Sequence, residues 1–174
     1  MKLIPLTQGY FAQVDDTDYD FLMQWKWCVM KTKNTFYASK CILIEGRKGR
    51  ISMHRFLLGL THLDKKLKGD HKDHNGLNNQ RSNIRIATSS QNNINTTGRG
   101  GSKYLGVSLK NKRVKYINKF GILKVYEPKY FEASIWDGKK RHYLGNFKDE
   151  ELAAKTYDIA AKKIHGEWAN LNFK

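Results

Sequence analysis

The chain has 174 residues, enough for one compact domain or two small ones, and 40% of them are hydrophobic, which argues against wholesale disorder. Its 32 Lys and Arg against 16 Asp and Glu leave a formal net charge of +16, which is typical of proteins that bind a polyanion, most often nucleic acid. No run approaches the ~18 consecutive apolar residues of a membrane span, and residues 1–5 lack the apolar region of a signal peptide, so we expect neither a transmembrane nor a secreted protein.

Two alternatives to nucleic-acid binding are a basic surface without a ligand and a ribosomal-type structural role.

The two cysteines, Cys28 and Cys41, are too few for a disulfide framework or a four-cysteine zinc site. We expect both cysteines to be buried as small apolar side chains, in a protein that works in the reducing interior of a cell.

The first half begins with an alternating pattern that predicts a strand over residues 3–14, interrupted at Gln8–Gly9. Carboxylates at residues 15–18 predict the N-cap and first turn of a short helix that runs through Leu22. Residues 25–29 and 35–39 predict paired strands, and residues 52–58 a short helix that ends at Gly59.

Residues 95–103 are polar and rich in glycine, which is the composition of a flexible connector. We therefore expect a domain over residues 1–97, a linker over 98–102 and a second domain over 103–174. The basic charge is shared between the halves: residues 1–97 carry 15 basic and 8 acidic side chains (+7), and residues 98–174 carry 17 and 8 (+9).

The second half predicts three strands, over residues 104–109, 131–136 and 141–144, the last two joined by an Asp-Gly turn. A helix follows, with Asp149 as its cap, an apolar stripe that includes Ile164, and Gly166 as its end. Residues 110–130 form a Lys-rich insertion between the first two strands, which predicts a lengthened hairpin.

The segment from Gly69 to Asn95 has almost no apolar periodicity, so a metal or a hydrogen-bond network must hold it. It carries the groups that phosphodiester hydrolysis needs. A neutral histidine can take a proton from water near neutral pH. A hard cation such as Mg²⁺ needs few protein ligands, because it keeps several waters and uses substrate phosphates, and Asp and Asn oxygens suit it.

The order of polar residues in this region resembles that of the His-Asn-His (HNH) nucleases, particularly the phage and intron homing-type group. The residues are His54–Arg55, then Asp70–His71, then Asn83 and Asn92. The resemblance covers residues 50–95 tightly and residues 14–27 more loosely. It implies a ββα-metal fold, in which two strands and a helix hold one divalent ion per site, Mg²⁺ or Mn²⁺.

By this resemblance, His71 is the general base, at the end of the first strand. Asp70 and Asn92 are the metal ligands, one from the strand and one from the helix. Asn83 is the central Asn of the catalytic site, which braces the loop and orients the imidazole.

Three assignments have alternatives. Asn93 or Asn95 replaces Asn92 as the ligand if the helix register differs. His54 and Arg55 are candidates for DNA phosphate contacts, and His54 also for support of the site. His74 is either a solvated turn residue or a group that reaches the metal water or the phosphate. The alternative to the whole motif is a polar loop whose Asn and Asp side chains only stabilise turns.

The second half resembles the plant APETALA2/ethylene-response-factor DNA-binding domain. The matching pieces are Tyr104–Val107, Phe131–Ile135, Tyr143–Phe147, Glu151–Ala161 and Leu171–Phe173. The resemblance covers nearly all of residues 103–173 and implies a three-stranded sheet that lies in the major groove, with the helix packed behind it. The sequence preference of the plant family is not carried over, because arginines expected on its first two strands are replaced by Leu105, Ser108, Lys110 and Trp136.

Strand alternation assigns the faces of this sheet. Phe131, Ala133 and Ile135 should face the helix. The residues that should form the outer, DNA-binding face are Ser108, Lys110, Ser134, Trp136, Arg141 and Tyr143. The alternative is an ordinary solvated face. We also expect phosphate contacts from the insertion, through Lys112, Arg113, Lys115 and Lys119.

Together these features predict an α+β protein: an N-terminal ββα-metal HNH nuclease domain, then a three-stranded antiparallel sheet packed on one helix. The expected function is metal-dependent hydrolysis of double-stranded DNA by a monomer in the cytoplasm of a bacterium or a phage-infected cell. The alternative is a DNA-binding regulator or packaging accessory with an inactive nuclease site.

Overall fold

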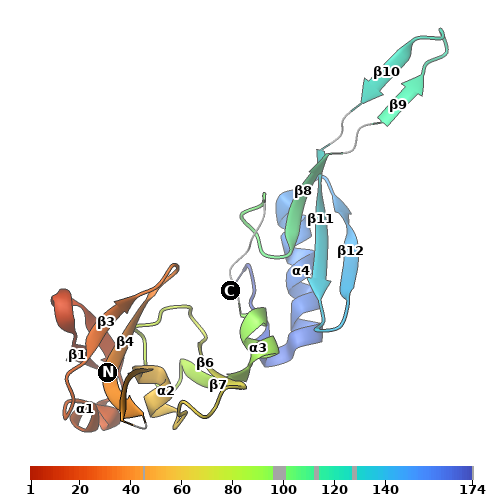
Figure 1. Ribbon diagram of the computed structural model, residues 1–174. Helices are drawn as coiled ribbons and strands as arrows, with labels where there is room; N and C mark the ends of the chain where they lie inside the picture. The colour runs from red at the N-terminus through yellow and green to blue at the C-terminus, as the bar shows by residue number, and fades with distance from the viewer. Residues whose placement is uncertain (45, 96–100, 112–113, 127–128, 174) are drawn as a thin grey trace. The chain divides into compact units, whose positions relative to one another are not determined.

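The computed structural model describes residues 1–44, 46–95, 101–111, 114–126 and 129–173, which form an α+β protein built mostly from strands (Figure 1). These ranges contain four α-helices and five small sheets. The chain divides into two compact units, Met1–Asn93 and Ile94–Lys174. Residues 98–100 of the expected linker lie outside the described residues. Within the described ranges, no helix has the length and apolar character needed to cross a bilayer.

The first unit combines three antiparallel sheets with short helices, and its sheets are β1–β2, β3–β4–β5 and β6–β7. Its elements are β1 (Lys2–Pro5), the 3-10 helix η1 (Thr7–Gly9), β2 (Phe11–Val14), α1 (Asp16–Leu22), β3 (Cys28–Lys31), β4 (Phe36–Ile44), β5 (Arg47–Ser52), α2 (Met53–Leu57), β6 (Leu67–His71), β7 (Ile84–Thr88) and α3 (Ser89–Ile94).

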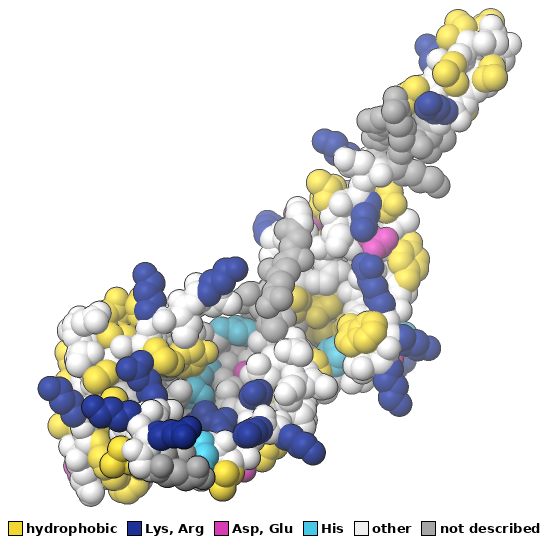
Figure 2. Space-filling model, viewed as in Figure 1, with side chains coloured by type: hydrophobic (Ala, Val, Ile, Leu, Met, Phe, Trp, Pro, Cys, Tyr) yellow, Lys and Arg dark blue, Asp and Glu magenta, His cyan; other side chains and the backbone are white. Residues whose placement is uncertain are grey.

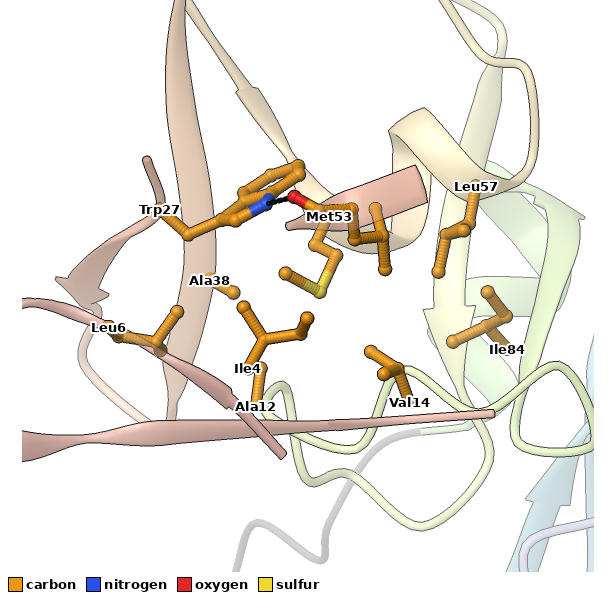
Figure 3. Close-up of a cluster of buried hydrophobic side chains, with 10 residues drawn as sticks. Ile4, Leu6, Ala12, Val14, Trp27, Ala38, Met53, Leu57 and Ile84 are labelled. Atoms are coloured by element: carbon orange, nitrogen blue, oxygen red, sulfur yellow. Dashed lines mark hydrogen bonds between the residues drawn. The ribbon is translucent and has the colours of Figure 1, made fainter. Parts of the chain in front are cut away.

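One apolar core holds the first unit together, and it takes side chains from six of these elements and from Leu6 and Trp27 (Figure 3). Ile4, Val14 and Met53 are each at most 1% exposed. Trp27 is buried as well, and its indole Nε1 donates to the Leu22 carbonyl at 2.9 Å, so the one polar atom of this large side chain is satisfied. Ile84 carries the core to the start of β7, next to the polar segment.

The predicted elements of this half are confirmed, with three differences. The strand predicted over residues 25–29 runs instead over Cys28–Lys31. Asp15 occupies the N-cap position of α1, but its carboxylate accepts hydrogen bonds from Arg81 N and Gln80 Nε2 instead of from the first turn. Strand β5 was not predicted, because its sequence RKGRIS is half basic and carries little alternation. It forms because β4 continues past the predicted end and turns back at Gly46, whose φ of 75° favours glycine.

The prediction that both cysteines are buried is wrong for Cys41, which is exposed on β4, while Cys28 is half-buried. Cys41 lies opposite Arg50 of β5, in the part of the sheet that extends beyond the core.

The second unit is a three-stranded sheet of order β12-β11-β8 backed by one helix, with a separate hairpin inserted in the chain. Its elements are β8 (Val107–Asn111), β9 (Val114–Ile117), β10 (Leu123–Tyr126), β11 (Lys129–Trp136), β12 (Arg141–Phe147), α4 (Glu150–His165) and the 3-10 helix η2 (Gly166–Trp168). The lengthened hairpin predicted in residues 110–130 is confirmed as β9 and β10.

Helix α4 follows the predicted cap and stop. The Asp149 carboxylate accepts from Leu152 N at 2.7 Å, a cap that stabilises a helix by about 1 kcal/mol, and Gly166 ends the helix with φ 55°. The predicted inner face of the sheet is confirmed, because Ala133 packs with Ala153 and Ile135 packs with Tyr157. Ile164 is exposed, so its place in the buried stripe was wrong.

Candidate active site and nucleic-acid interface

Asp70 and His71 are the last two residues of β6, and both are buried, at 6% and 5% exposed. Their partners across the hairpin are Arg85 and Ile84 of β7. Arg85 Nε donates to Asp70 Oδ2 at 2.8 Å, and both side chains are largely shielded from solvent. The order of elements is strand β6, strand β7 and helix α3, with the polar loop between the strands.

Asn83 holds the two ends of this loop together. Its amide donates to the Asp73 carboxylate at 2.9 Å and to the Asn78 carbonyl at 2.8 Å, and its Oδ1 accepts from Asp73 N at 3.1 Å. Lys72 N also donates to the Asn83 carbonyl. A polar segment without apolar periodicity is therefore held by a hydrogen-bond network, one of the two possibilities that the sequence leaves open.

The N-terminal hairpin fixes the far side of the loop, a feature that sequence reasoning missed. Gln13 N donates to the Leu77 carbonyl, and Asn79 N donates to the Gln13 carbonyl, each at 2.8 Å. Arg81 adds two hydrogen bonds of 2.8 Å to the carboxylate of Asp18, which is nearly buried. Spacing alone cannot pair residues 13–18 with residues 77–81, because more than sixty positions separate them.

His71 belongs to a cluster of three rings. The His54 ring lies 4.5 Å from that of His71, centroid to centroid, and the Tyr37 ring lies 5.5 Å from His54 and 5.7 Å from His71. Gly69 makes room for them, since a Cβ there would lie 2.2 Å from His54 Cδ2. His54 is 7% exposed, so its ring is buried against that of His71.

Burial controls the protonation of both histidines. Burial, assisted by the charges of His71 and Arg55, lowers the pKa of His54 to about 3. Burial also lowers the pKa of His71, while the Asn79 side chain and the carboxylates of Asp73 and Asp70 oppose that shift. His71 is therefore neutral at pH 7, the form that a general base requires.

The other predicted residues of this half lie as follows. Arg55 donates to the Thr61 and Leu67 carbonyls, so its guanidinium joins α2 to the chain that leads into β6. His74 has a φ of 64° in the turn after β6. Asn92 is half-buried in α3, and its neighbour Asn93 is exposed.

The chemistry of this donor set fits one hard divalent ion. Among the described residues, no three His, Cys, Asp or Glu side chains gather into a metal-binding group. A buried carboxylate such as Asp70 and an amide such as Asn92 are oxygen ligands of the kind that Mg²⁺ accepts in small number. The Arg85 contact means that a cation would share the Asp70 carboxylate with a guanidinium.

The outer face of the second unit carries exposed aromatic and basic groups. Trp136 is 57% and Tyr143 62% exposed, at one end of the β11–β12 pair. Arg141 Nε donates to Ser134 Oγ at 2.9 Å and its Nη2 to Glu132 Oε1 at 2.8 Å, which orients the guanidinium across the face. Ser108 lies opposite Glu132, and Lys110 opposite Tyr130. Figure 2 shows Lys and Arg side chains distributed over the visible surface.

Several pieces of the APETALA2-like pattern meet in one network behind this sheet. The Asn172 amide accepts from Leu105 N at 2.7 Å and donates to the Leu105 carbonyl at 3.1 Å. The buried Asp158 of α4 accepts from Asn172 N and Phe173 N. Gly106 lies over Tyr157 with φ 73°, and a Cβ there would lie 1.9 Å from the ring. Because Asn172 binds the backbone of Leu105, β8 begins at Val107 and not at Tyr104 as predicted.

Comparison with known proteins found similarity to an HNH endonuclease and to plant APETALA2-like proteins. The chain is 29% identical over 169 residues to an uncharacterized HNH endonuclease of Acanthamoeba polyphaga mimivirus, which covers 95% of this chain and 76% of that protein. It is 46% identical over 43 residues to an AP2-like ethylene-responsive transcription factor of Arabidopsis thaliana, and equally to APETALA2-like protein 2 of Oryza sativa subsp. japonica. These matches cover 25% of this chain and about a tenth of each plant protein. No family model and no solved structure matches the chain.

Proposed function

We propose that this protein is a metal-dependent DNA endonuclease of the HNH type, with a ββα-metal site in residues 50–95. The observation that carries the proposal is the buried, neutral His71 at the end of β6, beside Asp70 and next to a loop that Asn83 holds closed. The similarity to a viral HNH endonuclease over most of the chain supports it.

In this proposal His71 takes the proton from the attacking water, because burial keeps the imidazole neutral. Asn83 acts indirectly by fixing the loop, and the Asn79 side chain opposes the lowering of the His71 pKa that burial causes. Asp70 and Asn92 would hold one Mg²⁺ or Mn²⁺, which supplies charge for the phosphate and the leaving 3′ oxygen. His54 is a positioning residue, and phosphate contact remains a prediction for Arg55.

The second unit is proposed to target duplex DNA through the outer face of its sheet. Exposed Trp136 and Tyr143 beside an oriented Arg141 combine apolar, hydrogen-bonding and cationic groups, which is suited to sugars, base edges and phosphates. The likeness to plant transcription factors supports DNA as the partner. The proposed division of labour is a nuclease in residues 1–97 and a DNA-binding domain in residues 103–174, acting as a monomer.

The test is cleavage of plasmid and genomic DNA with Mg²⁺ or Mn²⁺. His71→Ala should lower the rate by roughly 10²–10⁴-fold and leave DNA affinity unchanged, because only the base is lost. His62→Ala removes an exposed histidine outside the ring cluster and should cleave at the wild-type rate. If His71→Ala cleaves as fast as the wild type, the base is another residue, and His74 is the first to examine.

One observation favours the alternative of a DNA-binding regulator with an inactive nuclease site. Arg85 already pairs with the Asp70 carboxylate, so a cation must compete for it. Absence of cleavage across metals, pH values and substrates, with DNA binding intact, would support the regulator. Loss of both would contradict the two functions together.

A further inference from the structure

The hairpin formed by β9 and β10 is a sheet of its own, inserted in the chain between β8 and β11 (Figure 1). Its strands pair Ile117 with Leu123 and Tyr116 with Lys124. The tip is well defined: Asn118 Oδ1 accepts from Phe120 N and Ile122 N at 3.0 Å each, and Gly121 has φ 77°. The turn therefore presents Phe120 on a fixed backbone.

The apolar side chains of this hairpin are exposed. Phe120 is 74%, Ile117 70%, Leu123 59%, Ile122 54%, Tyr116 51% and Val125 47% exposed. None of the core clusters found in the described residues includes them. An isolated two-stranded hairpin is marginally stable in water, and large apolar side chains left exposed together on one element indicate a binding surface. These side chains therefore point to a partner.

Charge identifies the kind of partner. Residues 114–126 contain Lys115, Lys119 and Lys124 and no acidic residue. Lys119 Nζ lies 5.0 Å from the Phe120 ring centroid, so the cation and the apolar tip are presented together. Figure 2 shows hydrophobic and basic side chains interspersed over this end of the molecule. A second copy would bring like charges together, whereas a polyanion would neutralise them.

We propose that the β9–β10 hairpin binds the minor groove of duplex DNA and inserts Phe120 between two base pairs, which kinks the duplex. The proposal rests on DNA as the partner in the proposed function. Phe120 carries no hydrogen-bonding side-chain atom that could read a base edge, but a flat apolar side chain at a fixed tip can unstack a base step. Proteins that wedge apolar side chains into the minor groove bend DNA by about 20–90°. Lys119 lies beside the wedge, where it can contact a phosphate, and Lys115 and Lys124 carry positive charge along the two strands.

The test uses the full chain without divalent metal, so that no DNA is cut. The probe is a short mixed-sequence duplex with donor and acceptor dyes at its ends and 2-aminopurine at a central TA step, which is easily kinked. Wild type should raise both the energy transfer and the 2-aminopurine fluorescence on binding. Phe120→Ala should keep binding, measured by anisotropy, and lose both signals. Ile159→Ala removes an equally exposed side chain from α4 and should behave as wild type.

A second pair of variants tests the cationic part. Lys119→Gln and Lys124→Gln should each lower the salt dependence of binding by about one ion, because each removes a phosphate contact. If Phe120→Ala bends the duplex as much as the wild type does, the proposed insertion of Phe120 is wrong. Loss of binding to phosphatidylserine vesicles in Phe120→Ala, with bending unchanged, would assign the hairpin to a membrane surface instead. Failure of the wild type to bind DNA would contradict the proposed function itself, whereas binding and cleavage with no bend contradict only the wedge.

Discussion

At the scale of single residues, Asp70 must serve two partners, the Arg85 guanidinium and the proposed cation. Its carboxylate is the one negative charge next to His71 in β6, and burial removes water as a substitute. Asp70→Ala should therefore abolish cleavage at every metal concentration, while binding to DNA measured without metal persists. Asp20→Ala, which removes an exposed carboxylate of α1, is the matched control. Cleavage by Asp70→Ala that recovers with more Mg²⁺ would show that the ion is held by other residues.

A substitution at Gly69 would test whether the rings packed around His71 hold it in place. A methyl group at Gly69 would lie 2.2 Å from the buried His54 ring, which must shift and press on His71. Gly69→Ala should lower the free energy of unfolding by about 1–3 kcal/mol, as overpacking does, and lower kcat more than it raises KM. Gly69→Ala combined with His54→Ala should recover part of both losses. Thermal unfolding and cleavage kinetics measure the two effects.

The sequence names candidate residues for the chemistry, but it does not predict which side chains surround them in the fold. Asp70, His71 and Asn83 could be named in advance because their order resembles the HNH pattern, in a segment without an apolar pattern. Three neighbours of His71 and Asp70 could not be named in advance: Tyr37, Asn79 and Arg85. Strand pairing or loop packing brings each of them to the site, and no local sequence pattern records such contacts. Their roles follow only from the fold.

At the scale of elements, the entry into β8 depends on one close contact. Gly106 has φ 73° and lies on the Tyr157 ring, so Gly106→Ala adds both backbone strain and a clash. It should destabilise the second unit by more than about 3 kcal/mol, the sum of an overpacked core and a left-handed backbone. Gly166→Ala, with φ 55° and no atom within 4 Å of the added Cβ, carries backbone strain without a clash and should cost less. Equal losses in the two variants would contradict the clash.

Elements with a strong local signal were predicted and those without it were not. Helix α4 was predicted from its cap Asp149, its helical stripe and its end at Gly166, and the β11–β12 hairpin was predicted from the Asp-Gly turn. Strand β5 and the late start of β8 depend on pairing with β4 and on hydrogen bonds to Asn172, and such distant partners leave no periodic trace.

At the scale of the whole molecule, the charges of +7 on residues 1–97 and +9 on residues 98–174 predict DNA binding by both halves. A fragment of residues 98–174 should bind duplex DNA without cutting it, with an affinity that falls steeply as salt rises. Arg141→Ala or Trp136→Ala should weaken that binding. A folded 98–174 fragment that binds no duplex at low salt would contradict the targeting role.

A fragment of residues 1–97 should retain weak and less selective cleavage, because the base and both proposed ligands lie within it. Its core is small, and small domains bury little surface, so folding must be verified by circular dichroism before activity is judged. A folded 1–97 fragment that is inactive with Mg²⁺ and Mn²⁺ would contradict the proposed site.

The backbone ladder between Gln13 and residues 77–79 has a consequence for how this protein can exchange parts with others. Genes that spread by recombination trade blocks of coding sequence, and a breakpoint is tolerated where few contacts cross it. A breakpoint between residues 20 and 50 would leave the motif of residues 50–95 formally complete and yet separate its loop from Gln13 and Asp18. Descendants of such an event would carry every signature residue on a loop that has lost its anchors. We therefore expect lineages of this protein to inherit their first residues together with the motif.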